Sequence, residues 1–390
     1  MNDLGRRLRE APLPGEAAAR ERARMTVLAA HAAAPHRARV RPARAVLAAV
    51  LLVALGALTA PGQAVATWLG VDGPARAVKR LVSDVVGPSA TPRRAPAALP
   101  APGRLLVAGP RGAWIVDRDG ARRRLGAWTA GTWSPGGVYV ALVAGRSLAA
   151  VDPQGRVRWR LELGARVSTP RWAPDGTHVA YRAGRALRVV YGNGAHDRLV
   201  APVTAPVAPA WRPTAPHTLA WAGADGRVRI ADADTGRLLR LIRARDVSQI
   251  AWSADGQRLL VAVPAGGRVH DLATGRSSRL RLRSGRTKLT AAAFSPKGDR
   301  LALAVRLPSG SSELRLLGRA QPLLAAPGRL SDLTWSPDGR WLLAAWPAAR
   351  QWLLVRTAGR PRVLAVAGLT HRYGPAARPQ AWCCGRAKPG

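Results

Sequence analysis

The chain has 390 residues, of which 47% are hydrophobic, which excludes a chain that is disordered throughout and provides ample material for a core. It carries 61 basic and 22 acidic residues, a formal net charge of +39, and only two cysteines, which exclude a disulfide-rich scaffold and a multi-cysteine zinc or iron–sulfur module. The 40 glycines and 32 prolines indicate a chain rich in turns.

The positive charge first suggests nucleic-acid binding. However, the 46 basic and 16 acidic residues of segment 101–390 are spread without a dense basic run. No helix-turn-helix, zinc-finger or aromatic RNA-binding signature accompanies them. We therefore expect no specific nucleic-acid binding, and leave an anionic envelope polymer open as a general electrostatic partner.

The N-terminal part of the chain contains one predicted membrane span. Residues 1–44 form a basic and partly helical segment, and the run AVLAAVLLVALGALTA begins the apolar segment 45–66. Because about 20 apolar residues cross a bilayer as a helix, this segment predicts a transmembrane signal-anchor. Four arginines precede it closely, at positions 37, 39, 41 and 44. The short-flank charge rule places the N-terminus in the cytoplasm and the rest of the chain outside the cytoplasmic membrane.

The sequence Ala64-Val65-Ala66 is similar to a signal-peptidase site, but a leading region of 44 residues is longer than a signal peptide allows. Whether this site is cleaved stays open. Residues 67–103 follow the span and predict a juxtamembrane helix (68–86) and then an extended, semi-rigid Pro/Ala linker.

A turn motif recurs about every 40 residues along the remainder of the chain. Its spacings are 39, 39, 41, 42 and 41 residues, and a degenerate seventh unit follows 47 residues later. The aromatic residues that begin the units, which we predict to be structural anchors packed between neighbouring units, are Trp133, Trp172, Trp211, Trp252, Phe294, Trp335 and Trp382.

Each unit predicts four short strands. The four residues Ser336-Pro337-Asp338-Gly339 suit a type I turn. An apolar strand, a second short strand and a third polar strand follow most of the turns, and the strand with the aromatic residue makes four, which is the pattern of a propeller blade. The turn residues to which we assign a structural role are Pro135, Asp175, Gly176, Asp255, Gly256, Pro296, Gly298, Asp338 and Gly339.

The [Trp/Phe]-Ser-Pro-Asp-Gly turn followed by an apolar strand resembles the TolB-like, or PD40, class of WD40-like propeller repeats of bacteria, over residues 104–385. The resemblance implies a β-propeller and is specific for architecture rather than for function. The chain lacks the Gly-His and Trp-Asp dipeptides of eukaryotic WD40 repeats. The unit at Trp211 has Arg-Pro-Thr-Ala in place of Ser-Pro-Asp-Gly, so we expect a looser turn there.

The two ends of the repeat array predict how the ring closes. Three strand-like runs (104–108, 113–117 and 122–125) precede Trp133 without a Trp-bearing first strand, and that first strand reappears as residues 379–382. We therefore predict an all-β, seven-bladed propeller closed by a composite blade, which removes exposed sheet edges. Six or eight blades would require that one blade is misread. Residues 386–390 form a tail.

We expect no catalytic, metal-binding or cofactor-binding residues and no cofactor. The histidines, at 31, 36, 178, 196, 217, 270 and 371, show no i, i+4 or HExxH pairing, and those at 178, 217 and 270 suit partly buried, hydrogen-bonded positions in or beside strands. The segments 151–159 and 230–236 are similar to quinoprotein repeats, yet ordinary hairpin turns explain them. Adjacent cysteines in a strand point to opposite faces, so we expect Cys383 and Cys384 to be free thiols, without settling their redox state.

Three functions remain to be weighed. The first is a membrane-anchored, exported and non-enzymatic propeller that binds or scaffolds an unidentified protein partner through its loops. The second is a transmembrane sensor whose basic segment 1–44 acts on a cytoplasmic regulator, as in membrane-spanning anti-sigma factors. The third, disfavoured because no site for it is found, is a propeller enzyme, either a hydrolase or a quinoprotein. The sequence determines neither the partner nor the oligomeric state.

Overall fold

The computed structural model describes residues 93–94, 98–282, 285–360, 362–374 and 376–384. The chain divides into two compact units, Met1–Ala90 and Thr91–Gly390, and all described residues belong to the second. The predicted segments 1–44 and 45–66, most of 67–103 and the tail 386–390 therefore lie outside the described residues. Within the described part, no helix has the length and apolar character needed to cross a bilayer.

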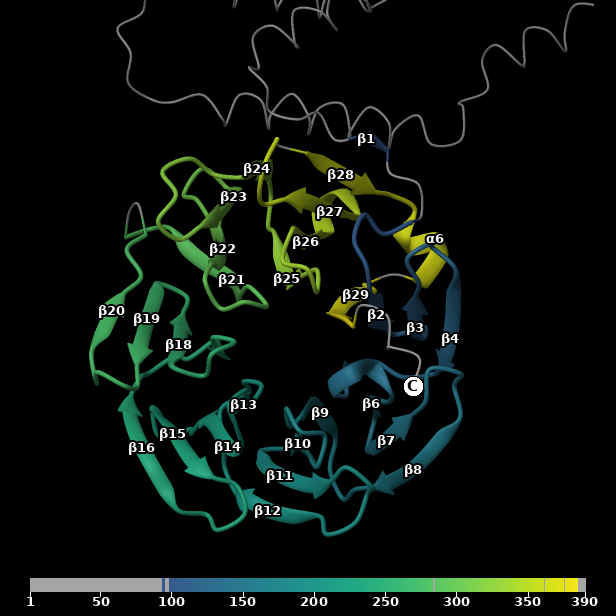
Figure 1. Cartoon of the computed structure of the whole chain (residues 1–390), viewed down its shortest axis with the longest axis vertical. Coiled ribbons are helices and arrows are strands. Elements are labelled where there is room, and N and C mark those ends of the chain that lie inside the picture. The colour runs from purple at the N-terminus through teal and green to yellow at the C-terminus, as the bar shows by residue number, and fades with distance from the viewer. Residues whose placement is uncertain (1–92, 95–97, 283–284, 361, 375, 385–390) are drawn as a thin grey trace, which may run out of the picture. The chain divides into compact units, whose positions relative to one another are not determined.

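Seven sheets surround a common axis, so the prediction of an all-β, seven-bladed propeller is confirmed (Figure 1). In each sheet the repeat-bearing strand is innermost, and successive strands pair antiparallel toward the circumference. From the axis outward, the first blade consists of β29 (Arg378–Cys383), β2 (Arg104–Gly109), β3 (Gly112–Val116) and β4 (Arg122–Gly126), and the second of β5 (Ala130–Trp133), β6 (Val140–Ala144), β7 (Ser147–Val151) and β8 (Val157–Glu162). The third blade consists of β9 (Val167–Trp172), β10 (His178–Ala183), β11 (Ala186–Tyr191) and β12 (Arg198–Ala201). The fourth consists of β13 (Ala210–Arg212), β14 (Ala215–Ala222), β15 (Arg227–Asp232) and β16 (Leu238–Arg243).

The other three blades have the same order. They are β17 (Gln249–Trp252), β18 (Arg258–Val263), β19 (Gly266–Asp271) and β20 (Ser277–Arg279); β21 (Lys288–Phe294), β22 (Leu301–Arg306), β23 (Ser311–Leu316) and β24 (Leu324–Pro327); and β25 (Ser331–Trp335), β26 (Trp341–Trp346), β27 (Gln351–Arg356) and β28 (Val363–Val366), to which β1 (Arg93–Arg94) adds in parallel.

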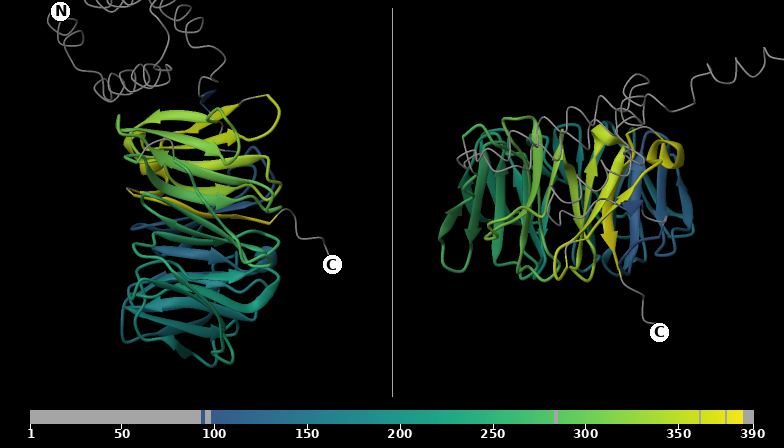
Figure 2. Two further views of the ribbon diagram at one scale, coloured as in Figure 1. Left: turned by 90° about the vertical axis from the view of Figure 1, so that its left-hand side faces the viewer. Right: turned by 90° about the horizontal axis from the view of Figure 1, so that it is seen from above.

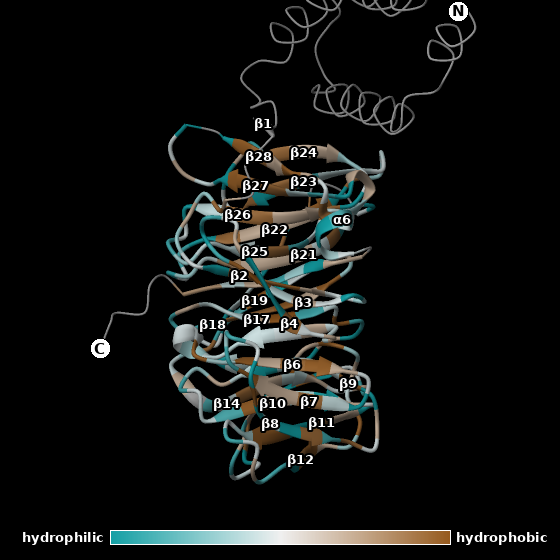
Figure 3. Ribbon diagram, turned by 90° about the vertical axis from the view of Figure 1, so that its right-hand side faces the viewer, coloured by the Kyte–Doolittle hydropathy of each residue, from teal (hydrophilic) through white to brown (hydrophobic). Residues whose placement is uncertain are grey.

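The burial and polarity of each strand depend on its distance from the axis of the ring. The second strands are almost entirely apolar and buried, as in β26, because neighbouring blades cover both of their faces. The outer strands β4 and β20 are largely exposed and polar. Hydrophobic residues accordingly gather on the strands, whereas many of the connecting loops are hydrophilic (Figure 3). Seen from the side, the ring is a disc whose strands run between its two faces (Figure 2).

The ring closes through a composite blade. Strand β29, from the end of the chain, pairs antiparallel with β2, and Trp382 lies opposite Leu105. Leu105 is fully buried and Trp382 is buried. The inner edge of β2, which would otherwise be unpaired, is thereby covered by β29, the last strand of the described residues.

Two features of the seventh blade were not expected. Helix α6 (Leu369–Tyr373) lies between β28 and β29 and accounts for the longer spacing before Trp382. The Tyr373 ring stacks on Trp352, with centroids 5.5 Å apart. The end of the predicted linker is also not free, because Leu99 and Ala101 are buried in the same apolar cluster as Trp352.

The connection after Trp211 differs from the other turns. Arg212 pairs with Ala215 around Pro213 and Thr214, but the register then shifts, and Trp211 pairs with Leu219. In the unit that begins at Trp252, by comparison, the aromatic residue pairs with Leu259. The connection at Trp211 is therefore one residue longer and its pairing is irregular, which agrees with the prediction of a looser turn.

Candidate functional site

The repeat aromatics lie between blades. The six tryptophans of the motif are buried, and Phe294 is half-buried. Three indole Nε1 groups each donate a hydrogen bond to a backbone carbonyl of the preceding blade's innermost strand: Trp211 to Arg171 (2.9 Å), Trp252 to Ala210 (3.0 Å) and Trp335 to Ala293 (3.0 Å). These residues hold neighbouring blades together.

The turn residues organise the loop that follows each aromatic residue. In the turn that ends at Gly339, the glycine N–H donates to Ser336 O, as in a type I turn. Ser336 Oγ accepts from Trp341 N–H and donates to Asp338. The same glycine N–H bond recurs in four other units, and the glycines at position four that have positive φ are Gly137, Gly176, Gly256, Gly298 and Gly339.

A set of arginines joins consecutive blades beside the repeat turns. The sequence analysis did not identify them. Arg300 lies 5.0 Å from the centroid of the Trp335 ring and donates to Gly339 O (2.8 Å) and Thr357 Oγ1 (3.0 Å). Arg104, Arg212 and Arg258 make the corresponding pair of contacts with the aromatic ring and the turn glycine of the blade that follows. Part of the arginine excess is thus structural.

Two histidines meet between the third and fourth blades, and His178 stands where Arg258 and Arg300 stand in their own units. His178 begins β10 and His217 lies in β14, and their rings meet edge-to-face with centroids 5.2 Å apart. Asp234, from the turn between β15 and β16, contacts both of them. The only group of three His, Cys, Asp or Glu residues within metal-binding reach in the described part of the chain is His178, His217 and Asp234.

Both histidines lie in strands, are at least partly buried and form hydrogen bonds, as expected, but the sequence analysis did not indicate that their rings meet. A signal was present, because each histidine lies six residues after the aromatic residue of its own unit, Trp172 or Trp211. The signal is incomplete, because His178 directly precedes Val179, the cross-strand partner of Trp172, whereas His217 lies two residues before Leu219, the partner of Trp211. His270, by contrast, lies in β19. Burial lowers the pKa of its imidazole, and the positive charges of Arg268 and Arg240 lower it further.

The two histidines have opposite electrostatic environments. Burial lowers the pKa of His178, which is only 4% exposed. The hydrogen bond with Asp234 raises the pKa of His217, and the Asp234 and Asp175 charges act in the same direction. Burial raises the pKa of the Asp175 carboxyl, but the hydrogen bonds from Thr177 and the nearby His217 outweigh this effect and lower it.

The prediction of free thiols at the end of the chain is wrong. Cys383 and Cys384 form a disulfide with each other. Both residues were expected in one strand, with side chains on opposite faces, but β29 ends at Cys383 and Cys384 has a positive φ of 56°. The backbone therefore leaves the strand at Cys384, and the opposite-face rule does not apply there.

The circumference of the third and fourth blades carries exposed leucines. β16 is an edge strand that pairs only with β15, and its Leu238, Leu239 and Leu241 are 53%, 43% and 44% exposed. Leu199 of the neighbouring edge strand β12 is 53% exposed. We call these four residues the leucine edge. β12 and β16 follow one another around the circumference (Figure 1).

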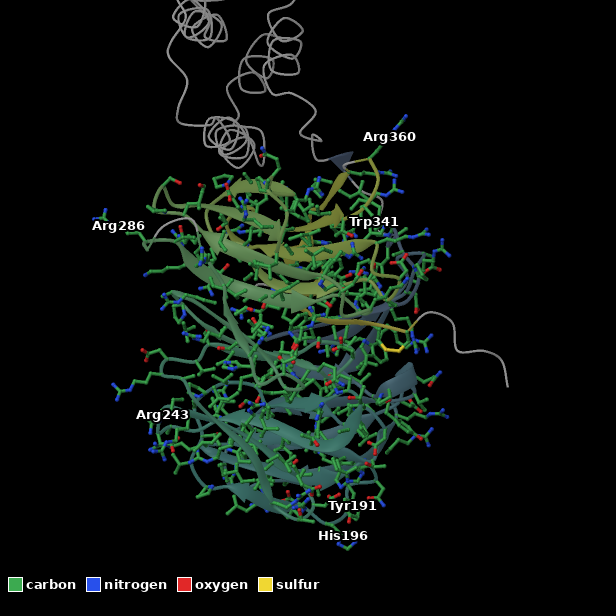
Figure 4. The ribbon with its side chains drawn as sticks, turned by 60° about the vertical axis from the view of Figure 1, so that its left-hand side comes forward. Tyr191, His196, Arg243, Arg286, Trp341 and Arg360 are labelled. Carbon is green, nitrogen blue, oxygen red and sulfur yellow. A yellow bond between two sulfur atoms is a disulfide. The ribbon has the colours of Figure 1, made fainter. Side chains whose placement is uncertain are left out.

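The leucine edge has a positively charged border. Arg237, Arg243 and Arg245 are exposed next to it, and no ion pair joins them to other residues of the described ranges. The Arg243 side chain extends outward from the ring (Figure 4). An apolar strip with arginines beside it, on an unpaired strand edge, suits an acidic protein segment that adds to the sheet.

No protein-family profile and no curated protein sequence matches the chain. Among solved structures, the chain is similar to "Kuenenia stuttgartiensis Hydrazine Synthase", with a TM-score of 0.48 and 17% identity, covering 58% of this chain and 76% of that chain. It is also similar to the Cps50 (Swd1) β-propeller domain of Myceliophteria thermophila, with a TM-score of 0.45 and 15% identity, covering 54% and 74%.

Proposed function

We propose that the chain is a membrane-anchored, exported and non-enzymatic propeller of the TolB-like kind that binds an acidic protein partner through the leucine edge. Propellers commonly serve as protein-interaction modules, because a rigid ring presents loops and strand edges to other molecules. The observation that carries this proposal is the group of three exposed leucines on the unpaired edge strand β16.

The composition of β16 favours a binding partner over chance exposure of its leucines. Edge strands usually avoid aggregation by carrying charged or short sequences, as β4 and β20 do here. β16 is longer, with six residues, and its sequence LLRLIR places three exposed leucines beside its two arginines. A partner strand with acidic side chains would pair with its free backbone groups, cover the leucines and lie against Arg243.

The test is a comparison of retained proteins between matched variants. The full chain, purified in detergent, is used as bait against an envelope extract at about 0.5 M salt, where generic charge attraction is strongly screened. We expect at least one protein to be retained by the wild type and by Leu317→Glu, which changes a residue that is 50% exposed elsewhere on the ring. The same protein should be lost from Leu239→Glu and from Leu241→Glu.

Two results would contradict this proposal. The first is a set of retained proteins that is identical for all four baits. The second is a chain that sediments as a dimer in the wild type and as a monomer in Leu239→Glu, which would assign the leucine edge to a second copy of the chain instead of an acidic partner.

Membrane anchoring is tested separately. We expect alkaline phosphatase fused after Gly103 to be active in a bacterial host and a reporter that works only in the cytoplasm to be silent there, because the arginines before residue 45 are retained inside. The reverse pattern would refute the topology. Deletion of residues 1–43 distinguishes the alternative function, since changed transcription would favour a transmembrane regulator.

A further inference from the structure

His178 presents a buried nitrogen that has no hydrogen-bond partner. The residue is 4% exposed, and its Nε2 lies 3.3 Å from Asp234 Oδ1 without forming a hydrogen bond. A neutral imidazole nitrogen buried in this way loses its interaction with water and gains nothing in exchange. The position of the atom, directed at a carboxylate from the next blade, calls for a bound cation.

The second histidine completes a set of donor atoms. His217 Nδ1 contacts Asp234 Oδ2, and the donor atoms of His178, His217 and Asp234 all lie within 4.8 Å of one another. Ligands held about 2.0–2.1 Å from a tetrahedral zinc ion lie about 3.3–3.4 Å apart, which matches the His178–Asp234 distance. An ion between His217 and Asp234 would replace their direct contact.

The remaining nitrogen of each imidazole is already held by a common network. His178 Nδ1 lies 2.7 Å from Thr177 Oγ1, which donates to Asp175 Oδ2 at 2.8 Å. His217 Nε2 lies 3.5 Å from the same Asp175 oxygen. Metal-binding histidines characteristically have their second nitrogen bonded to a carboxylate or another acceptor, which fixes the tautomer and the ring orientation. Thr177 fills that role for His178, and the Asp175 carboxylate faces the second nitrogen of His217.

The local charge is compatible with a cation. Asp175 and Asp234 supply two carboxylates, and the positive group that faces them is Arg198, which donates to Asp234 Oδ1 at 3.0 Å and to the backbone carbonyl of Ala233. Arg198 and His178 therefore both face Oδ1 of Asp234, and Oδ2 faces His217. The side chains of His217 and Asp234 are 42% and 38% exposed, so solvent reaches the site.

We propose that His178 Nε2, His217 Nδ1 and the Asp234 carboxylate bind a divalent transition metal, Zn²⁺ in the first instance, between the third and fourth blades. Two imidazoles and one carboxylate are donors that Zn²⁺ accepts, and three protein ligands leave one position for water or an external donor. The ion would join two blades whose contact here lacks the arginine that links several other pairs. It does not depend on the proposed partner.

The test uses the full chain with an affinity tag that contains no histidine. The protein is stripped with chelator, and Zn²⁺ affinity is measured by competition with a chromophoric chelator. We expect one tight site. His217→Gln and Asp234→Asn should each weaken it by more than the roughly 10–100-fold that Asp175→Asn, which removes an outer partner, is expected to cost. His270→Gln is the matched control and should bind as the wild type does.

A second measurement tests the donor atoms themselves. Co²⁺ bound at the site should give the visible absorption of a four-coordinate ion, and this absorption should be lost in His217→Gln and Asp234→Asn. Thermal unfolding of the metal-free variants shows whether each remains folded, and both altered side chains are partly exposed, so they should. Unchanged Zn²⁺ affinity in these two variants would place the ion elsewhere and overturn the proposal, as would the absence of a Zn²⁺ site in the wild type.

Discussion

The indole Nε1 of Trp252 donates a hydrogen bond of 3.0 Å to the carbonyl oxygen of Ala210, which lies on the innermost strand of the preceding blade. Ala210 directly precedes Trp211, so the bond joins equivalent places of two repeat units. By contrast, the Nε1 atoms of Trp133, Trp172 and Trp382 are buried without a hydrogen-bond partner. The same residue type therefore has two different energetic roles in one ring.

Replacing Trp252 by phenylalanine should lower the free energy of unfolding by about 1 kcal/mol beyond the loss of packing, because a buried carbonyl loses its donor. Trp133→Phe is the matched control, since it removes an indole N–H that bonds to nothing. Urea unfolding of the two variants measures the difference. Equal losses in both would mean that packing alone determines the effect.

Removal of the closing strand should destabilise the whole ring. A chain that ends at Gly374 lacks β29 and leaves the inner edge of β2 unpaired, and it also loses the buried Trp382. We expect a loss of at least about 3 kcal/mol, comparable to deletion of a large buried aromatic side chain. The control is a chain that ends at Cys384 and retains β29. If both truncated chains melt at the same temperature, the ring closes in another way.

The arginine contacts between blades should depend on the guanidinium group and not on charge alone. Arg300→Lys retains the charge but loses the planar group that lies over Trp335 and reaches both Gly339 O and Thr357 Oγ1. We expect a loss of about 1–2 kcal/mol in unfolding free energy. Arg306→Lys, at an exposed end of β22, should change it by less than about 0.5 kcal/mol. An equal effect of the two substitutions would contradict the structural role.

Acid should weaken the second blade through Asp152. Burial raises the pKa of this carboxyl, but hydrogen bonds and the charge of Arg156, with the Gln154 N–H, lower it from 3.8 to about 2. A lowered pKa in the folded state gives stability that is complete above about pH 4 and disappears as the pH falls toward 2. Asp152→Asn should therefore be less stable than the wild type at pH 7, and the difference should shrink between pH 4 and 2. A difference that stays constant over that range would exclude this origin.

The sequence alone determined the architecture, because repetition of one turn at nearly constant spacing requires repeated units, and an incomplete first unit requires completion from the other end of the chain. The pairing of segment 379–382 with segment 104–108 could be predicted in this way, whereas the register that places Trp382 opposite Leu105 comes from the structure. The missing Ser-Pro-Asp-Gly sequence also indicated an irregular connection after Trp211, but not the register shift between Trp211 and Arg212. The disulfide was missed because the strand ends one residue earlier than the alternation argument assumed.

Only the tertiary structure brought His178, His217 and Asp234 together. The two histidines are 39 residues apart and belong to different blades, and Asp234 lies in the turn between β15 and β16. No short sequence motif therefore contains these three residues. The same applies to the leucine edge, since the sequence of β16 does not reveal that this strand lies at the circumference with one edge unpaired. The turns and spacing of the sequence determine the repeat, whereas contacts between blades depend on how the units stack, and those contacts decide which side chains meet.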